Sequence, residues 1–145
     1  MRSKRPCAVR NLTACEAAIQ GSRGPDAPPL YPAAYMEVIA VTATDQRDQL
    51  YADANRGSYI ALAAPGVDII APVLSGAYEL WSGTSMAAAH VSGVVALMLE
   101  RNGMLDWREA QTILATSART PPEGAAADRY GAGIVDAAST LGSLK

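Results

Sequence analysis

The chain has 145 residues, with 12 Lys and Arg, 14 Asp and Glu and one His, and its formal net charge is −2. Half of the residues are hydrophobic, which suits one folded domain and excludes disorder over most of the chain. The charge balance gives no support to a nucleic-acid partner, and the sequence lacks the run of about 18 apolar residues that predicts a membrane span. The two cysteines, Cys7 and Cys15, fit neither a disulfide framework nor a zinc site.

The first 23 residues differ from the rest of the chain in charge. They hold five basic side chains and one acidic side chain, whereas residues 24–145 hold seven basic and thirteen acidic side chains. We therefore predict an atypical basic segment at residues 1–23 and a domain at residues 24–145. The segment is interpreted as a loosely attached arm, or as sequence from a shifted reading frame, a rearrangement or a wrong start. Arg10 and Asn11 interrupt its apolar residues, so no secretion signal is predicted and no compartment is indicated.

Short apolar runs follow a loop whose Gly and Pro residues are typical of turns, at residues 24–29. Their length and their β-branched residues predict four strands, at residues 37–43, 58–63, 67–71 and 78–81. A polar loop is predicted between the first two strands, at residues 45–53.

The last third of the chain predicts helices. Residues 85–101 lack proline and carry apolar side chains on almost every side, which predicts a helix buried all round and ended at Asn102 and Gly103. Asp106 is a predicted N-cap for a second helix that reaches about residue 117. A loop at 120–124, a turn at Gly131 and Gly133, and a final short helix at 135–141 complete the prediction.

Ser85 is the best candidate for a reactive side chain, because it lies between a predicted strand and the long helix, directly after Gly83 and Thr84. The first N–H groups of a helix have no partner within the helix, so they can stabilise a developing oxyanion. On this tripeptide alone, two other interpretations stay open. Thr84 or Ser85 is simply the helix N-cap, or the segment is the nucleophile elbow of an α/β-hydrolase with Ala87 in place of its last glycine. The hydrolase would need a histidine downstream, where only His90 is found.

The longer string at residues 82–93, SGTSMAAAHVSG, resembles the nucleophile motif of the subtilisin-like serine peptidases, the subtilases. The family usually has proline before the histidine, where this chain has Ala89. Further segments resemble the family in the same order along the chain: residues 31–33 with 38–41, residues 55–67, and residues 130–137. The resemblance covers about residues 24–142, the C-terminal half of a typical catalytic domain. It implies an α/β fold, part of a mostly parallel subtilisin-like sheet with flanking helices, incomplete at its N-terminal side.

The resemblance also implies a serine endopeptidase that cleaves peptide or protein substrates by acyl transfer. Ser85 matches the nucleophile, and Gly83 and Thr84 belong to the loop around the oxyanion. Ser22 stands where the family has its oxyanion asparagine, and Asn11 and Asn55 are not at the matching position. No segment resembles the family's triad Asp and His. We therefore expect a chain that is inactive as a fragment, or that acts only with a partner chain supplying the N-terminal half.

Three other features are given structural interpretations. His90 follows Ser85 by five residues, and five steps along a helix rotate by about 140° and rise about 7.5 Å. His90 therefore cannot act as the base for Ser85, and it is predicted to be a hydrogen-bonded core histidine. Trp81 is expected either to wall a substrate cleft or to pack in the strand core. The aspartates of the predicted polar loop lack an EF-hand spacing, so a solvated loop is expected there: Asp45, Asp48 and Asp53. The resemblance makes calcium conceivable as in other subtilases, but no cofactor or metal ligands are assigned.

Overall fold

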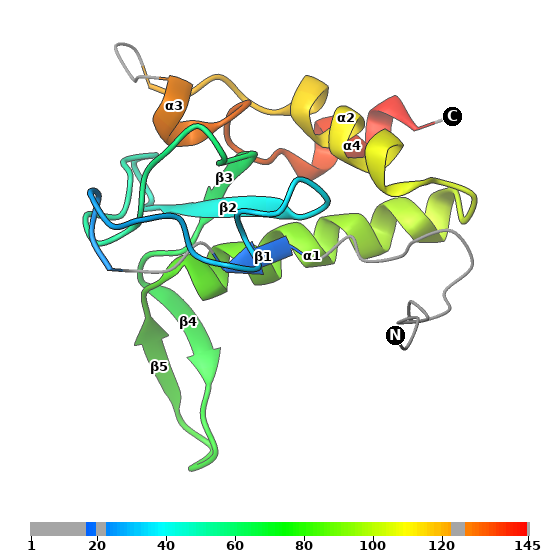
Figure 1. Cartoon of the computed structure of the whole chain (residues 1–145). Helices are drawn as coiled ribbons and strands as arrows, with labels where there is room; N and C mark the ends of the chain where they lie inside the picture. Colours follow the sequence, from blue (N-terminus) through cyan, green and yellow to red (C-terminus); the bar gives the residue numbers. More distant parts are fainter. Residues whose placement is uncertain (1–16, 20–22, 123–126, 145) are drawn as a thin grey trace, which may run out of the picture.

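The computed structural model describes residues 17–19, 23–122 and 127–144 (Figure 1). Its centre is a three-stranded parallel sheet in the order β1–β2–β3, formed by Ala17–Ile19, Ile39–Thr44 and Leu62–Pro65. The long helix α1 (Thr84–Arg101) lies along this sheet. The chain therefore has the expected α/β architecture. None of the described helices is long and apolar enough to cross a membrane.

The central strand β2 is buried along its whole length, as expected for a parallel strand covered on both faces. Ile39, Val41 and Ala43 pack in the main core together with α1. Ala40 packs on the opposite face against Ala33, in a layer built mainly by loop residues. The strand predicted at residues 37–43 is confirmed, although it begins at Ile39 and ends at Thr44.

Helix α1 is confirmed, but its expected burial on all sides is wrong. The face toward the sheet is buried and consists of Thr84, Ala87, Ala88, Val91, Val94, Val95 and Met98. The opposite face is open, and Leu97 on it is 45% exposed. The reason is that the described sheet covers only one side of the helix. The predicted end at Asn102 is correct, because its N–H donates to the Met98 carbonyl at 2.9 Å.

Two further helices pack together beside the C-terminal part of α1 (Figure 1). In α2 (Trp107–Ser117) the predicted cap is confirmed, since the Asp106 carboxylate accepts the Glu109 N–H at 2.8 Å and the Glu109 carboxylate accepts the Asp106 N–H at 2.9 Å. Helix α4 (Ala137–Ser143) begins two residues later than predicted, because Asp136 caps it by accepting the Ser139 N–H at 2.9 Å. A four-residue helix, α3 (Ala127–Tyr130), was not predicted.

Other strands differ from the sequence prediction. Strand β3 starts four residues later than the predicted 58–63 and includes Pro65, which is tolerated at the end of a strand at the sheet's margin. The runs predicted at 67–71 and 78–81 do not join the parallel sheet. They form β4 (Ile69–Pro72) and β5 (Tyr78–Trp81), an antiparallel hairpin that projects from the body (Figure 1).

Strand β1 lies within the segment that the charge pattern set apart. Ala17, Ala18 and Ile19 pair in parallel register with Ile39, Ala40 and Val41 of β2. No strand was predicted there, since three residues carry no periodicity. The division of the chain at residue 23 stays a prediction, and Cys7 and Cys15 lie outside the described residues.

The predicted turn at Gly131 and Gly133 lets the chain return along the free side of β3. Gly131 has φ 61°, and a Cβ there would lie 2.4 Å from the carbonyl carbon of Ala61. Only glycine fits this approach. The Ala63 N–H then donates to the Gly133 carbonyl at 2.9 Å, and the Val135 N–H donates to the Ala63 carbonyl at 2.8 Å.

Candidate functional site

Ser85 is the second residue of α1, and its side chain is exposed at the N-terminal end of the helix. Gly83 is the N-cap, without a side-chain cap, so the interpretation of Thr84 or Ser85 as the N-cap is wrong. Thr84 is 1% exposed and packs inward, whereas Ser85 points outward. In the part of the chain that the structure describes, the Ser85 hydroxyl has no hydrogen-bond partner. The structure thus presents Ser85 as an exposed hydroxyl at the start of α1.

The loop before Ser85 is held by the carboxyl end of β2 through Gly66. The N–H groups of Gly66 and Val67 donate to the Thr44 carbonyl at 2.9 and 3.2 Å, and the Gly83 N–H donates to the Gly66 carbonyl at 2.7 Å. These bonds link the end of the sheet to the residue that caps α1. These main-chain contacts therefore help to place the loop.

Gly66 is buried where this loop, β2 and α1 meet. A Cβ at this position would lie 2.7 Å from the Ala43 Cβ, 2.8 Å from the Gly83 carbonyl oxygen and 3.1 Å from the Ala87 Cβ. Carbon atoms in contact normally lie about 3.5–4.0 Å apart, so no larger residue fits without moving the loop. The segment Ala64-Pro65-Gly66 therefore positions the candidate nucleophile, a role that the sequence analysis did not assign to it.

The backbone at the start of α1 offers a hydrogen-bond donor beside the Ser85 hydroxyl. The Met86 N–H donates to the Gly83 carbonyl at 3.1 Å, while the Ser85 N–H has no acceptor among the described residues. A Cβ built on Gly83 would lie 3.9 Å from the Ser85 nitrogen, which is an ordinary contact distance. The helix dipole favours negative charge at this end. The arrangement is able to stabilise an oxyanion that forms next to Ser85.

Neither His90 nor Asn55 joins this group. The His90 Nδ1–H donates to the Met86 carbonyl at 2.9 Å, so the predicted hydrogen bond is present. The predicted core location is wrong, because His90 is exposed on the open face of α1. Asn55 is fully buried and holds loops together, since it accepts the Arg23 N–H at 3.1 Å and donates to the Pro28 carbonyl at 3.3 Å. Ser22, the residue at the expected oxyanion-asparagine position, lies outside the described residues.

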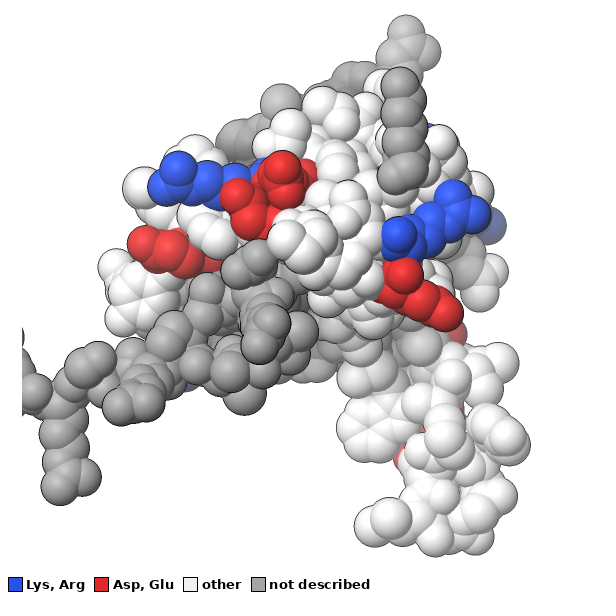
Figure 2. Space-filling view, turned by 90° about the vertical axis from the view of Figure 1, so that its right-hand side faces the viewer, with Lys and Arg blue, Asp and Glu red and all other residues white. Residues whose placement is uncertain are grey.

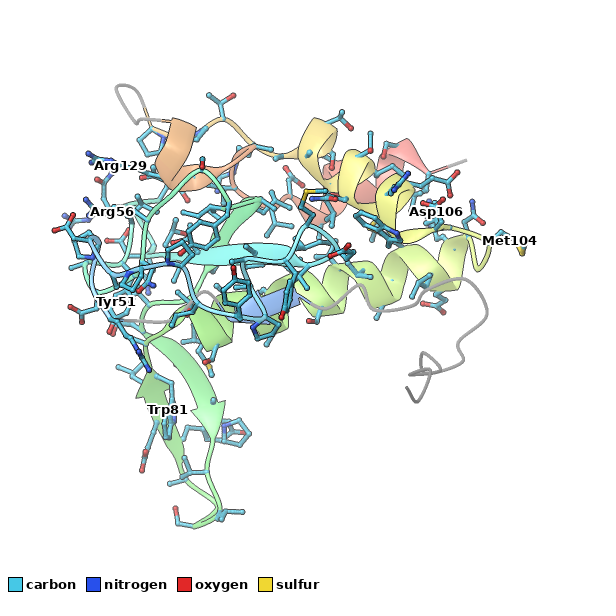
Figure 3. All side chains as sticks on the ribbon, in the orientation of Figure 1. Tyr51, Arg56, Trp81, Met104, Asp106 and Arg129 are labelled. Carbon is cyan, nitrogen blue, oxygen red and sulfur yellow. The ribbon has the colours of Figure 1, made fainter. Side chains whose placement is uncertain are left out.

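The hairpin β4–β5 leads directly into the nucleophile loop. The Asp68 N–H donates to the Ser82 Oγ at 2.9 Å and ties the base of the hairpin. Trp81 is 48% exposed on β5 (Figure 3), so its interpretation as core packing is wrong. It instead lines an open groove with Pro72, Val73, Leu74, Ser75 and Glu79.

Two of the three loop aspartates, Asp45 and Asp48, make separate structural contacts. The Asp45 carboxylate accepts the N–H groups of Arg47 and Gln49, both at 2.8 Å. The Arg119 guanidinium forms a two-bond ion pair with Asp48, which lowers the pKa of that carboxyl. The described residues contain no group of three or more His, Cys, Asp or Glu arranged to hold a metal ion.

The open face of α1 carries a mostly apolar groove of about 460 Å³. Its lining comes from β4 and from one side of α1: Ile69, Met86, Ala89, His90, Gly93, Val94 and Leu97. Small residues at Ala89 and Gly93 leave the helix backbone accessible there. Met86, the residue after the candidate nucleophile, thus lines a mostly apolar surface that no described element covers.

Comparison with known proteins agrees with the motif and with the fold. The sequence model of the subtilase family matches residues 11–133. The chain is 48% identical over 67 residues to a thermophilic serine proteinase of Bacillus sp. (strain AK1), which is 46% of this chain and 17% of that protein. It is 37% identical over 100 residues to subtilisin E of Bacillus subtilis (strain 168), which is 69% of this chain and 26% of that protein.

A solved structure shows the same relation in three dimensions. The patellamide maturation protease PatA superimposes with a TM-score of 0.75 and 33% sequence identity, over 86% of this chain and 49% of that one. The chain therefore spans half or less of the length of the relatives it matches. It belongs to the subtilase family.

Proposed function

We propose that Ser85 is the nucleophile of a subtilase-type serine peptidase that acts on peptide or protein chains. The observation that carries this proposal is the pairing, at the start of α1, of an exposed Ser85 hydroxyl with a Ser85 N–H that has no acceptor among the described residues. Membership of the subtilase family supports the same assignment.

In the proposed reaction the Ser85 Oγ attacks the carbonyl carbon of a peptide bond, and its proton passes to a base. The carbonyl oxygen becomes an oxyanion that accepts a hydrogen bond from the Ser85 N–H at the positive end of the helix dipole. Collapse of this intermediate expels the amine, which receives the proton, and leaves an acyl ester on Ser85. Water then releases the acid and restores the hydroxyl.

The base and its orienting acid are proposed to come from outside these 145 residues. His90 is the only histidine, and its Nδ1–H already donates to the Met86 carbonyl of its own helix. The mostly apolar groove on the open face of α1, which includes Met86, gives an added segment a surface to pack on. That segment is either another part of a longer chain or a partner chain.

The residue expected at the oxyanion-asparagine position, Ser22, weakens the completed site. Removing one oxyanion donor costs about 10²–10³ in kcat, a magnitude measured on subtilisin itself. A completed enzyme should therefore gain activity from Ser22→Asn, and the same substitution in the 145-residue chain alone should change nothing measurable.

Labelling with a fluorophosphonate probe tests the assignment. We expect no labelling of the isolated chain, and labelling after addition of an N-terminal half of a subtilase catalytic domain that carries the Asp and His. Ser85→Ala should abolish the adduct. Ser92→Ala, a serine on the same helix whose hydroxyl donates to the Ala88 carbonyl at 2.9 Å, should leave the adduct intact.

The outcomes separate the two functional candidates. Labelling of the isolated chain at Ser85 would contradict the need for an added base. Absence of labelling with every added half that binds would identify the chain as a catalytically inactive fragment.

A further inference from the structure

The hairpin β4–β5 has two chemically different faces. Cross-strand pairing sets Ile69 opposite Trp81 and Ala71 opposite Glu79, which puts Glu79 and Trp81 on one face of the ribbon. The other face carries only uncharged side chains: Ile70, Pro72, Tyr78 and Leu80. Figure 2 shows the hairpin as a projecting arm that is almost wholly without Lys, Arg, Asp or Glu.

Glu79 and Trp81 line the same open groove, which has a volume of about 770 Å³. The remaining lining residues, 72–75, are apolar or small, so Glu79 is the one charged side chain in the groove. An exposed carboxylate beside an indole ring is a combination that recognises a cation, since the carboxylate supplies charge and hydrogen-bond acceptors and the ring face supplies a cation–π contact.

We propose that this groove binds an extended peptide through a Lys or Arg side chain of that peptide. The cation contacts Glu79 and Trp81, and the apolar walls at Val73 and Leu74 accept its aliphatic stem and a neighbouring apolar side chain. Resting on the proposed function, we infer that the bound peptide is the substrate chain, because Trp81 precedes Ser85 by four residues.

The backbone of the hairpin favours an extended ligand. β4 pairs only with β5 in the described part of the chain, so the ribbon offers free edges to a third strand. A two-stranded hairpin is marginal alone, and a third strand supplies main-chain hydrogen bonds while side chains give selectivity. The hairpin itself supplies no cation to the groove, since residues 68–81 contain neither Lys nor Arg.

The test is peptide binding to the full 145-residue chain, read from the indole fluorescence of Trp81 in a Trp107→Phe background. The probes are the capped hexapeptide Ala-Ala-Leu-Arg-Ala-Ala and the same peptide with citrulline, the neutral analogue of arginine. We expect saturable binding of the arginine peptide, several-fold weaker binding of the citrulline peptide, and loss of the difference at high salt.

Two variants locate the contact. Glu79→Gln should weaken arginine-peptide binding about two- to fivefold, the range of an exposed ion pair, and should leave citrulline-peptide binding unchanged. Glu100→Gln makes the same change in charge at an exposed position of α1 and should leave both affinities unchanged. Glu79→Lys should reverse the preference toward a peptide with Glu in place of Arg.

Equal binding of the arginine and citrulline peptides, or equal effects of Glu79→Gln and Glu100→Gln, would overturn the proposal. Self-association of the chain with no response to either peptide would also overturn it and would assign the hairpin to a second copy. These results are independent of Ser85 labelling, so failure of peptide binding and failure of the proposed function are distinguishable.

Discussion

Replacing Gly66 with alanine should both destabilise the protein and misplace the candidate nucleophile. The added methyl carbon would lie 2.7 Å from the Ala43 Cβ and 2.8 Å from the Gly83 carbonyl oxygen. The first distance is far below the 3.5–4.0 Å or so of a normal contact between carbon atoms, and both are closer than real Cβ atoms approach other heavy atoms. Both neighbours are fixed by the backbone. The relief available is an outward movement of the loop that caps α1.

The expected loss in free energy of unfolding is about 1–3 kcal/mol, the usual cost of forcing an extra methyl group into a packed site. The same movement would strain the hydrogen bond of 2.7 Å that the Gly83 N–H donates to the Gly66 carbonyl. A shift of about 1 Å at a catalytic group costs on the order of 10²-fold in rate. Fluorophosphonate labelling of the completed enzyme should therefore slow by more than the loss of folded protein explains.

Urea unfolding and the labelling rate per folded molecule are the two measurements. Gly142→Ala is the matched control, because a Cβ at Gly142 has no neighbour within 4 Å and the residue lies inside α4. It should raise stability by up to about 1 kcal/mol, since alanine is the better helix former. Wild-type stability and labelling in Gly66→Ala would refute the proposed positioning by Gly66.

Five other substitutions give three separate tests of the fold. Asp106→Ala should cost about 1 kcal/mol by removing the α2 cap, and Asp106→Asn should restore most of it in thermal unfolding. Leu114→Ala should cost about 2–5 kcal/mol because Leu114 is fully buried, whereas Leu97→Ala, on the open face, should cost less than about 1 kcal/mol. Arg119→Gln should lower stability at pH 7 by up to about 1 kcal/mol, since its ion pair with Asp48 is partly exposed. Because the pKa of Asp48 is lowered, the ion pair stabilises the folded protein fully above the ordinary carboxyl pKa of about 3.9, and this contribution is lost as pH falls through the lowered value. The denaturation midpoints of the wild-type and Arg119→Gln proteins should therefore converge in strong acid. Midpoints that stay equally far apart there would contradict this assignment.

Local signals in the sequence predicted several elements correctly. Asp106 and Glu109 form a capping box within four residues, and the run that became β2 is apolar and β-branched, so each structure follows from neighbours in the chain. The nucleophile motif likewise placed Ser85 at the start of a helix. The resemblance to subtilases, based on short motifs in the same order along the chain, predicted the family that the match over residues 11–133 then showed.

The tertiary structure alone decided which side of α1 is buried. Its sequence is apolar on nearly every side, so periodicity does not distinguish the face toward β2 from the face that carries His90 and Leu97. The same limit applies to the hairpin. The sequence predicts strands at residues 67–71 and 78–81, but only the structure shows that they pair with each other in antiparallel orientation and do not join the parallel sheet. Gly66 shows the point most clearly, because its tight space is formed by Ala43, Gly83 and Ala87, which come from three segments of the chain. Helix caps and hydrophobic periodicity depend on residues that are near one another in the chain, so the sequence predicts them. Burial and strand pairing depend on contacts between distant segments, which only the folded chain brings together.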